Sequence, residues 1–327
     1  MNRAGELLER VRGSGAVLLT GPEGPDGDSI GACLALRRLF LAVAPGVRVD
    51  VAGRPGHRYA DLPDADVMVA DDQIGSYDAV IVLDGDRSRV SSRVAAAFDA
   101  AGWTGLIDHH RSTDTSVYQV ALFEPEAEST CGMVYRLAQA WGVPLDAALA
   151  AQIYTGVIFD TGGFRYSNTQ PSTHRMAAEL LGTGFDHTAL TLRVLVERRR
   201  PAIDLLTTVL QHARYSPDGT VVLAGCRLAD FAGCGAQAED ADGIVDTLQH
   251  ITGVELAGLL LERDESRVKV SLRSRGAVNV AELSRGLGRG GGGHAKAAGV
   301  TLAMPYDEAE NLVFERMVAS LAESGAP

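Results

Sequence analysis

The sequence lacks the features of several large classes of protein. None of its 327 residues falls in an unbroken apolar run of the roughly 18 to 20 residues that cross a membrane. The first residues, MNRAGELLERVRGSG, carry mixed charge and no apolar core, unlike a secretory signal peptide. A net charge of −12 argues against a large surface for duplex nucleic acid. We therefore expect a cytoplasmic protein that binds neither a membrane nor a long duplex.

Cysteine is sparse, and two common catalytic motifs are absent. The chain has no GxSxG nucleophile elbow and no Walker loop with a GK[ST] ending, which argues against a serine hydrolase and a P-loop enzyme. Its cysteines form no CxxC pair, and we interpret them as reduced packing residues: Cys33, Cys131, Cys226 and Cys234. Neither a disulfide framework nor a thiolate metal site is predicted.

The length and the pattern of apolar runs predict two α/β domains. In the first half, short runs rich in Val, Ile and Leu alternate with longer helical segments, as in a parallel doubly wound sheet. The expected strands are 16–20, 47–53, 78–84 and 104–108, and the expected helices are 29–43, 92–102, 129–142 and 145–160. Such a sheet binds its ligands outside the carboxyl ends of its strands.

The second half has a different pattern. One helix leads through RRRP into another, and then come a hairpin around 217–219, two strands joined by a charged turn, a helix and a glycine-rich segment. We predict a doubly wound α/β domain at 1–186, a helical linker at 187–204 and a smaller α/β domain at 205–327. A cleft is expected between the two domains.

Four segments of the first half carry acidic or imidazole groups where predicted elements end. PDGD (25–28) follows the first strand, Asp84 ends the third, IDHH (107–110) ends the fourth, and Asp160 ends a helix. Each alone has a structural explanation, such as a turn or a helix cap, although adjacent histidines at a buried strand end are uncommon. Together they would converge on one crevice, and such ligands suit Mn²⁺ in preference to Mg²⁺ or Co²⁺. Two such ions about 3.5–4 Å apart are suited to phosphoryl hydrolysis.

The second half holds two candidate phosphate-binding segments. SLRSRG (271–276) places Arg273 and Arg275 on one face of a strand, which could equally be a solvated edge. GGGGHAKAAG (290–299) is either a flexible linker or a loop whose backbone approaches a ligand closely. Arginine forks and unshielded backbone N–H groups both bind phosphate oxygens.

Six motifs give the chain a family resemblance. PDGDSIG, LDGD, IDHH, FDTGGFRYSNT, LRSRG and GGGGHAKAAG occur in the order found in the DHH phosphoesterase superfamily. The chain most resembles the bacterial oligoribonuclease/pAp phosphatase (nanoRNase) group, which carries an associated C-terminal domain. The likeness covers nearly the whole chain.

The resemblance implies roles for particular residues. The ligands of one metal ion would be Asp26 and Asp84, and those of the other would be Asp28, Asp84, His109 and Asp160. Catalytic His110 would face the scissile phosphate, and Asp108 would orient His109. The substrate's phosphate or terminal nucleotide would contact Arg273, Gly292, Gly293 and His294. A hydroxide bridging the two ions would be the nucleophile.

One motif departs from the family pattern. Family members usually have a histidine three residues before the motif proline, as HxxPDGD, and that histidine binds the first metal ion. Here the position is Pro22, which has no donor atom, and the adjacent carboxylate is Glu23. We therefore expect one complete metal site and one weakened site.

The resemblance implies a Mn²⁺-dependent phosphohydrolase with oligoribonuclease-like 3'-5' exonuclease activity. Its substrates would be very short RNA, linear dinucleotides such as pApA, or pAp, and a homodimer is expected. A small second domain closing on a cleft suits a short anionic substrate. One alternative is a nucleotide-binding or regulatory protein whose catalysis is weakened by Pro22. Another is a family-II-type inorganic pyrophosphatase.

Overall fold

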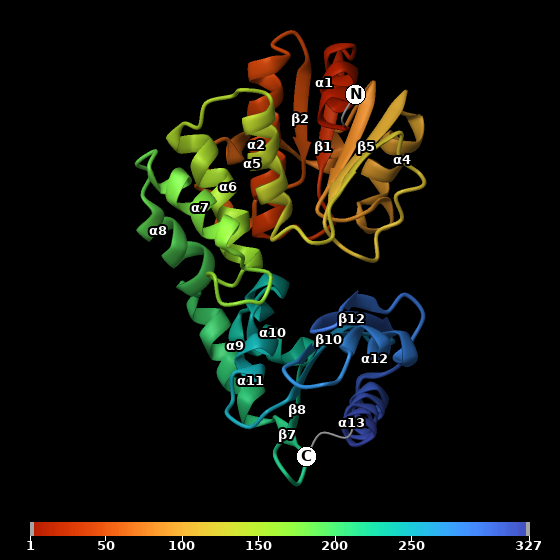
Figure 1. The fold of residues 1–327 in the computed structure, drawn as a ribbon. Coiled ribbons are helices and arrows are strands. Elements are labelled where there is room, and N and C mark those ends of the chain that lie inside the picture. Colours follow the sequence, from red (N-terminus) through yellow and green to blue (C-terminus); the bar gives the residue numbers. More distant parts are fainter. Residues whose placement is uncertain (1–2, 325–327) are drawn as a thin grey trace. The chain divides into compact units, whose positions relative to one another are not determined.

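The chain forms two compact units, each built on its own sheet. The computed structural model describes residues 3–324 and divides the chain into Met1–Glu197 and Arg198–Pro327 (Figure 1). Each unit contains one six-stranded sheet with helices packed on it. The predicted fold class, a parallel α/β domain followed by a smaller α/β domain, is confirmed. Within residues 3–324, no helix is both long enough and apolar enough to span a membrane.

The first sheet is entirely parallel, with strand order β3-β2-β1-β4-β5-β6. Its strands are β1 (Ala16–Thr20), β2 (Arg48–Ala52), β3 (Met68–Val69), β4 (Ala79–Leu83), β5 (Trp103–Asp108) and β6 (Val120–Phe123). All four expected strands are present. The two edge strands β3 and β6 were not predicted, because their two and four residues are too short to give a clear apolar run.

Helices cover both faces of the first sheet. Successive residues of a strand point to opposite faces, so Leu19 joins one core and Leu18 the other. One face packs against α1 (Arg3–Arg12), α2 (Gly27–Val43) and α5 (Thr130–Ala140). Helix α6 (Ala147–Asp160) packs on α2 and α5, and α7 (Pro171–Leu181) packs on α6. The other face packs against α4 (Ser92–Ala100), which Figure 1 shows on the opposite side of the sheet from α2 and α5. Shorter segments are α3 (Gly56–Tyr59), η1 (Ala65–Val67), η2 (Asp71–Gln73) and η3 (Arg87–Arg89).

Two glycines allow α2, α5 and α6 to approach one another closely. A Cβ atom placed at Gly31 would lie 2.5 Å from the backbone oxygen of Gln152. A Cβ atom placed at Gly156 would lie 2.2 Å from Oδ1 of Asp28 and 2.4 Å from Sγ of Cys131. Neither position has room for a larger residue. The start of α2 is thereby held against the N-terminus of α5 and the middle of α6.

The connection between the units consists of two helical pieces separated by an extended segment. The first unit ends with α8 (His187–Thr191) and the π-helical segment η4 (Leu192–Val196). The backbone is extended at Glu197 and Arg199, with ψ of 137° and 149°. Helix α9 (Arg200–Gln211) then begins with a proline in its first turn, where the missing N–H has no cost.

The second sheet is mixed, with strand order β11-β12-β10-β9-β8-β7. Its strands are β7 (Arg214–Tyr215), β8 (Val221–Cys226), β9 (Leu256–Asp264), β10 (Arg267–Ser274), β11 (Gly292–His294) and β12 (Ala297–Leu302). Only β8 and β9 pair in parallel. One face packs against α9, α10 (Leu228–Cys234), η5 (Ala238–Ala241) and α11 (Ile244–Gln249), and the other against α12 (Val280–Leu287) and α13 (Tyr306–Glu323). The hairpin around 217–219 is confirmed.

Candidate metal centre

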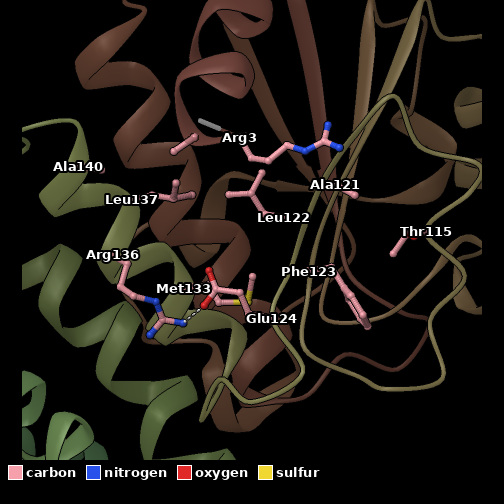
Figure 2. Close-up of a pocket in the computed structure, with 11 residues that line it drawn as sticks. Arg3, Thr115, Ala121, Leu122, Phe123, Glu124, Met133, Arg136, Leu137 and Ala140 are labelled. Atoms are coloured by element: carbon pink, nitrogen blue, oxygen red, sulfur yellow. Dashed lines mark hydrogen bonds and ion pairs between the residues drawn. The ribbon is translucent and has the colours of Figure 1, made fainter. Parts of the chain in front are cut away.

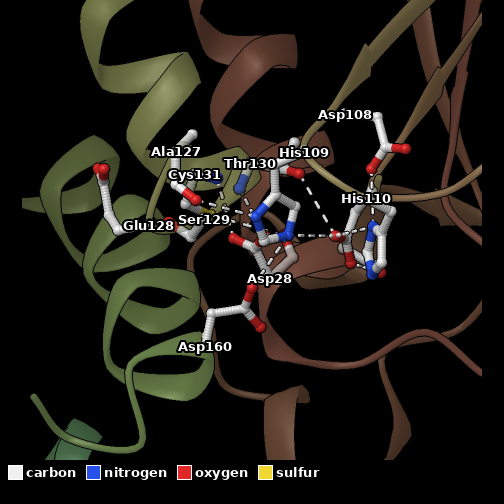
Figure 3. Close-up of polar contacts among 12 residues, drawn as sticks. Asp28, Asp108, His109, His110, Ala127, Glu128, Ser129, Thr130, Cys131 and Asp160 are labelled. Atoms are coloured by element: carbon white, nitrogen blue, oxygen red, sulfur yellow. Dashed lines mark hydrogen bonds and ion pairs between the residues drawn. The ribbon is translucent and has the colours of Figure 1, made fainter. Parts of the chain in front are cut away.

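Acidic and imidazole side chains meet at the carboxyl edge of the first sheet. Asp84 follows β4, His109 and His110 follow β5, Asp28 lies in the first turn of α2, and Asp160 ends α6. Ligand atoms of Asp28, His109 and Asp160 all lie within 4.8 Å of one another. Those of Asp84, His109 and His110 form a second such group. These two groups are capable of holding a metal ion (Figure 3).

His109 lies at the centre of this arrangement. Its Nε2 is 3.1 Å from Asp160 Oδ2, 3.5 Å from Asp84 Oδ1 and 3.9 Å from Asp28 Oδ2. Its Nδ1 donates a hydrogen bond to the backbone oxygen of Ala127 at 3.1 Å. A backbone partner on Nδ1 fixes the ring and directs Nε2 at the carboxylates, as is usual for a metal-binding histidine.

The N-terminus of α5 holds Asp28. The backbone N–H of Thr130 donates to Asp28 Oδ2 at 2.6 Å, and that of Cys131 donates to Oδ1 at 2.9 Å. These N–H groups lack partners within the helix, and the positive end of the helix dipole favours a carboxylate. Asp28 is fully buried, so both of its oxygens depend on these contacts for fixed positions.

Two hydroxyl groups hold Asp84. The Ser29 hydroxyl donates to Asp84 Oδ2 at 2.6 Å, and the Thr130 hydroxyl donates to Oδ1 at 3.3 Å. Asp84 has a φ of 59°, in the left-handed region that costs a non-glycine residue roughly 1–2 kcal/mol. The chain therefore turns sharply straight after β4, and the two hydroxyls fix the carboxylate that this turn presents.

Asp108 lies against a different histidine from the one expected. We predicted that it orients His109, but its Oδ1 is 2.8 Å from Nδ1 of His110 and its Oδ2 accepts from the Thr113 hydroxyl. The cause is the direction of the side chains: Nδ1 of His109 faces the backbone oxygen of Ala127, whereas Nδ1 of His110 faces Asp108. Asp108 is thus a positioning residue for His110.

Asp26 has a structural role that competes with metal binding. It is the N-cap of α2, and its Oδ1 accepts hydrogen bonds from the backbone N–H of Asp28 and Ser29. It joins neither donor group of residues 3–324. Glu23 also joins neither group, and its side chain is exposed.

The carboxylates and imidazoles shift one another's pKa strongly. Burial by itself raises the pKa of Asp84, but hydrogen bonding and the charges of both imidazoles outweigh it and lower that pKa to about 2. Burial favours neutral His109, but Asp160 and Asp84 outweigh it and raise the pKa of His109 to about 12. Desolvation and the neighbouring carboxylates raise the pKa of Asp28 and Asp160, and that of Asp26 to about 8. This excess of negative groups fits a divalent cation, which would replace the bound protons.

Two of the predicted substrate residues of the second unit, Arg273 and His294, lie in one row across its sheet. Arg273 of β10 pairs with Ala297 of β12, which pairs with His294 of β11, so all three point to the same face. Arg273 Nε lies 2.7 Å from Oδ1 of Asp246, an ion pair that the sequence did not predict. Arg275 lies beyond the end of β10, so the expectation that both arginines share a strand face was wrong.

The glycine-rich segment is a hairpin and not a loop. Gly292 and Gly293 belong to β11, which pairs with β12. Gly293 has a φ of 134°, and a Cβ atom there would lie 2.5 Å from the backbone oxygen of Ala297. Glycine is therefore needed here for close packing of two backbones.

A separate hollow lies beside the edge strand β6. Its volume is about 560 Å³, and the lining includes Phe123 of β6 and Met133 of α5 (Figure 2). Glu124 and Arg136 also line it, and they form an ion pair of 2.8 Å. The metal-centre residues do not line it, so it is not part of this candidate site.

Comparison with known proteins decides the family. Residues 16–157 match the model of the DHH family, N-terminal domain, and residues 220–321 match the DHHA1 domain. The bifunctional oligoribonuclease and PAP phosphatase NrnA of Thermus thermophilus is 32% identical over 99% of this chain and 95% of its own length. The chain belongs to the DHH family. The resemblance inferred from the six motifs is confirmed.

Another relative is similar in sequence, and two solved structures are similar in fold. NrnA of Bacillus subtilis is 26% identical over 94% of this chain and 96% of its own length. An exopolyphosphatase-related protein from Bacteroides fragilis has a similar fold, with a TM-score of 0.87 and 22% identity, covering 99% of this chain and 98% of its own. Exonuclease RecJ bound to manganese superposes with a TM-score of 0.53 and 14% identity, over 99% and 94% of the two chains.

Some residues that shape the centre were not identified from the sequence. Ser29 and Thr130 bind Asp84, and Asn168 donates to the backbone oxygen of Asp160 at 3.1 Å. Ser29 directly follows the PDGD motif, and Thr130 is recognisable in the sequence only as a helix-cap candidate. Their hydroxyls meet Asp84 only after three separate elements fold together.

Proposed function

We propose that this DHH-family protein is a divalent-metal-dependent phosphohydrolase that cleaves very short RNA, linear dinucleotides such as pApA, or pAp. The observation that carries the proposal is the cluster of Asp28, Asp84 and Asp160 around His109. It occurs in a chain that aligns over nearly its whole length with an oligoribonuclease and PAP phosphatase. A net charge of −12 further favours a short substrate over a long polymer.

The cation would be held by Asp28, Asp84, His109 and Asp160. Mn²⁺ is the ion that we propose, because carboxylates together with one imidazole suit it and no thiolate is present. When bound, such an ion supplies positive charge to a phosphoryl oxygen and lowers the pKa of a water molecule. The hydrogen bonds to Asp28 and Asp84 keep these carboxylates directed at one point, so little reorganisation is needed on binding.

His110 is the residue that we assign to the scissile phosphate. Burial lowers its pKa, but Asp108 and Asp84 outweigh that effect and raise it, which favours the protonated ring. Its Nδ1 is fixed by Asp108 at 2.8 Å, so the ring presents Nε2 in one direction. A protonated imidazole in this position stabilises negative charge that develops on a phosphate oxygen.

The second unit would bind the rest of the substrate. We propose that Arg273, Gly292, Gly293 and His294 contact its phosphate or terminal nucleotide, with residues 1–186 as the catalytic domain and 205–327 as the substrate domain. The common sheet face of Arg273 and His294 supports this assignment. Asp246 pairs with Arg273. A substrate phosphate would therefore bind Arg273 together with that carboxylate or would displace it.

The experiment is a comparison of substrates with the purified full-length protein in Mn²⁺. We expect turnover of pApA or pAp, and slow or no turnover of pyrophosphate and long RNA. Asp84→Ala should remove the activity, whereas Asp86→Ala, a nearby carboxylate outside the cluster, should retain it. Binding of pAp without any turnover would overturn the proposal in favour of a nucleotide-binding protein, the alternative that Pro22 supports. Preferential hydrolysis of pyrophosphate would make the protein a pyrophosphatase.

A further inference from the structure

Asp84 is flanked by two sets of residues. One side has the ligands Asp28, His109 and Asp160, and the other side, near Pro22 and Asp26, has fewer available ligand atoms. We infer that the centre holds a single divalent cation, bound by Asp28, Asp84, His109 and Asp160, and that Arg89 provides the second positive charge for the substrate's phosphate. The identity of the substrate class rests on the proposed function. The number of ions does not, because it can be measured without turnover.

The position of Pro22 is beside the turn that presents Asp84. A Cβ atom placed at Gly85 would lie 3.8 Å from Cβ of Pro22, and one placed at Gly21 would lie 3.7 Å from the backbone oxygen of Leu83. Residue 22 therefore lies alongside the end of β4, within reach of the centre. Pro22 is buried there and brings no ligand atom.

The neighbouring carboxylates do not replace the missing ligand. Glu23 is exposed and outside both donor groups of the described chain. Asp26 also lies outside them, and its Oδ1 is engaged by two backbone N–H groups. Asp84 and His110 remain from the second donor group. Oδ2 of Asp84 already accepts from Ser29 at 2.6 Å, and Nδ1 of His110, which lies 3.7 Å from Asp84 Oδ1, is engaged by Asp108 at 2.8 Å. Mn²⁺ prefers about six oxygen or nitrogen ligands, so this side does not fit a second ion.

Arg89 lies beside the turn that presents Asp84. Its Nη1 is 3.7 Å from the position that a Cβ atom would take on Gly85, the residue after Asp84. Its backbone oxygen accepts from the N–H of Glu23 at 2.7 Å, which ties the Arg89 segment to the Pro22 segment. Among residues 3–324, its exposed side chain makes no hydrogen bond or ion pair.

Arg87, two residues earlier, provides the contrast. Its guanidinium pairs with Asp99 and lies 5.5 Å from the ring centroid of Phe98, so these intramolecular contacts already occupy it. Within the described residues, the Arg89 guanidinium makes no such ion pair, and a guanidinium can bind two oxygens of one phosphate. One cation and one guanidinium together would offset the charge of a phosphate monoester as it binds beside Asp84.

The first experiment counts metal ions. Metal-free parent protein, Pro22→His and Pro22→Ala are titrated calorimetrically with Mn²⁺, after thermal melting has shown that each is folded. We expect one ion per chain in the parent and in Pro22→Ala, and two in Pro22→His. Two ions in the parent, or none, would overturn the inference. One ion in all three would overturn the assignment of Pro22 as the cause.

The second experiment measures binding of inorganic phosphate to the Mn²⁺-loaded protein. We expect Arg89→Gln to weaken phosphate binding by about tenfold to a hundredfold while the protein still binds one Mn²⁺. Arg87→Gln is the matched control and should bind phosphate like the parent, and Arg89→Lys should retain part of the affinity. Equal phosphate affinity in Arg89→Gln and the parent would overturn the role of Arg89. If pApA is not hydrolysed but both expectations hold, only the proposed function fails.

Discussion

The two sides of Asp84 are built in different ways. On one side, Asp28 and His109 are buried and fixed by the backbone of other elements, and Asp160 lies against His109. On the other side, Pro22 has no ligand atom and Asp26 caps its own helix. The first side is positioned by contacts between distant parts of the chain, whereas the second is formed by one local turn. A metal site of high affinity needs the first kind of support.

The largest effect is expected when the complete side is broken. Asp28→Asn keeps the shape of the side chain but removes its charge from the buried cluster, where the N-terminus of α5 favours a carboxylate. We expect hydrolysis of pApA to fall about a thousandfold, which corresponds to several kcal/mol of transition-state stabilisation. Steady-state kinetics with Mn²⁺ would measure the loss. Turnover within tenfold of the parent would show that Asp28 does not bind the ion.

A second substitution disturbs the same ligands by adding a methyl group next to Asp28. In Gly156→Ala the new Cβ atom would lie 2.2 Å from Asp28 Oδ1, so α6 must move away from α2. We expect the free energy of unfolding to fall by about 1–3 kcal/mol, as in other overpacked cores. Chemical denaturation would measure the change. Gly46→Ala is the control, because a Cβ atom there has no atom within 4 Å apart from those of its chain neighbours. Equal stability losses in the two variants would contradict the explanation.

Ser29→Ala tests the support of Asp84 itself. The variant loses the 2.6 Å hydrogen bond to Oδ2 of Asp84 but leaves every proposed ligand in place. We expect Mn²⁺ affinity to fall about tenfold to a hundredfold, the usual effect of removing a residue that orients a ligand. Calorimetric titration would measure this, alongside the melting temperature of the metal-free protein. Unchanged Mn²⁺ affinity would mean that Asp84 does not depend on Ser29.

Metal binding by Asp28, His109 and Asp160 is expected to depend on pH. Asp28 and Asp160 have a raised pKa, and that of His109 is about 12, so the metal-free cluster retains protons near neutral pH. A cation must displace them, and its affinity therefore rises with pH by about tenfold per unit for each proton released. Titration with Mn²⁺ at several pH values between about 6 and 8, where proteins tend to be most stable, would measure the slope. An affinity independent of pH would contradict this picture of the cluster.

Much of the fold could be predicted from apolar runs. The expected strand 16–20 coincides with β1, and 104–108 differs from β5 only at its first residue. These runs are buried on both faces, so their composition is nearly uniform and easily recognised. Strand β11 could not be predicted in this way, because its residues Gly-Gly-His resemble a loop until β12 is seen to pair with them.

The metal centre could be predicted as a set of residues but not as a set of contacts. The ends of parallel strands must meet at one edge, which is why Asp84 and His109 could be grouped from the sequence. Side-chain direction is different, because it depends on local dihedral angles and on neighbours from other elements. The partner of Asp108 was wrong for this reason, and the pairing of Arg273 with Asp246 was not foreseen.

The most direct measurement is the hydrolysis of pApA by the parent and by Asp84→Asn, each in Mn²⁺ and each with the metal removed by a chelator. Asp84 is the carboxylate shared by both sides of the centre, and the asparagine substitution keeps the size of its side chain while removing the charge. We expect turnover in the parent that requires Mn²⁺ and disappears in the variant. Turnover that survives either the substitution or the chelator would contradict a metal-dependent phosphohydrolase built on Asp84.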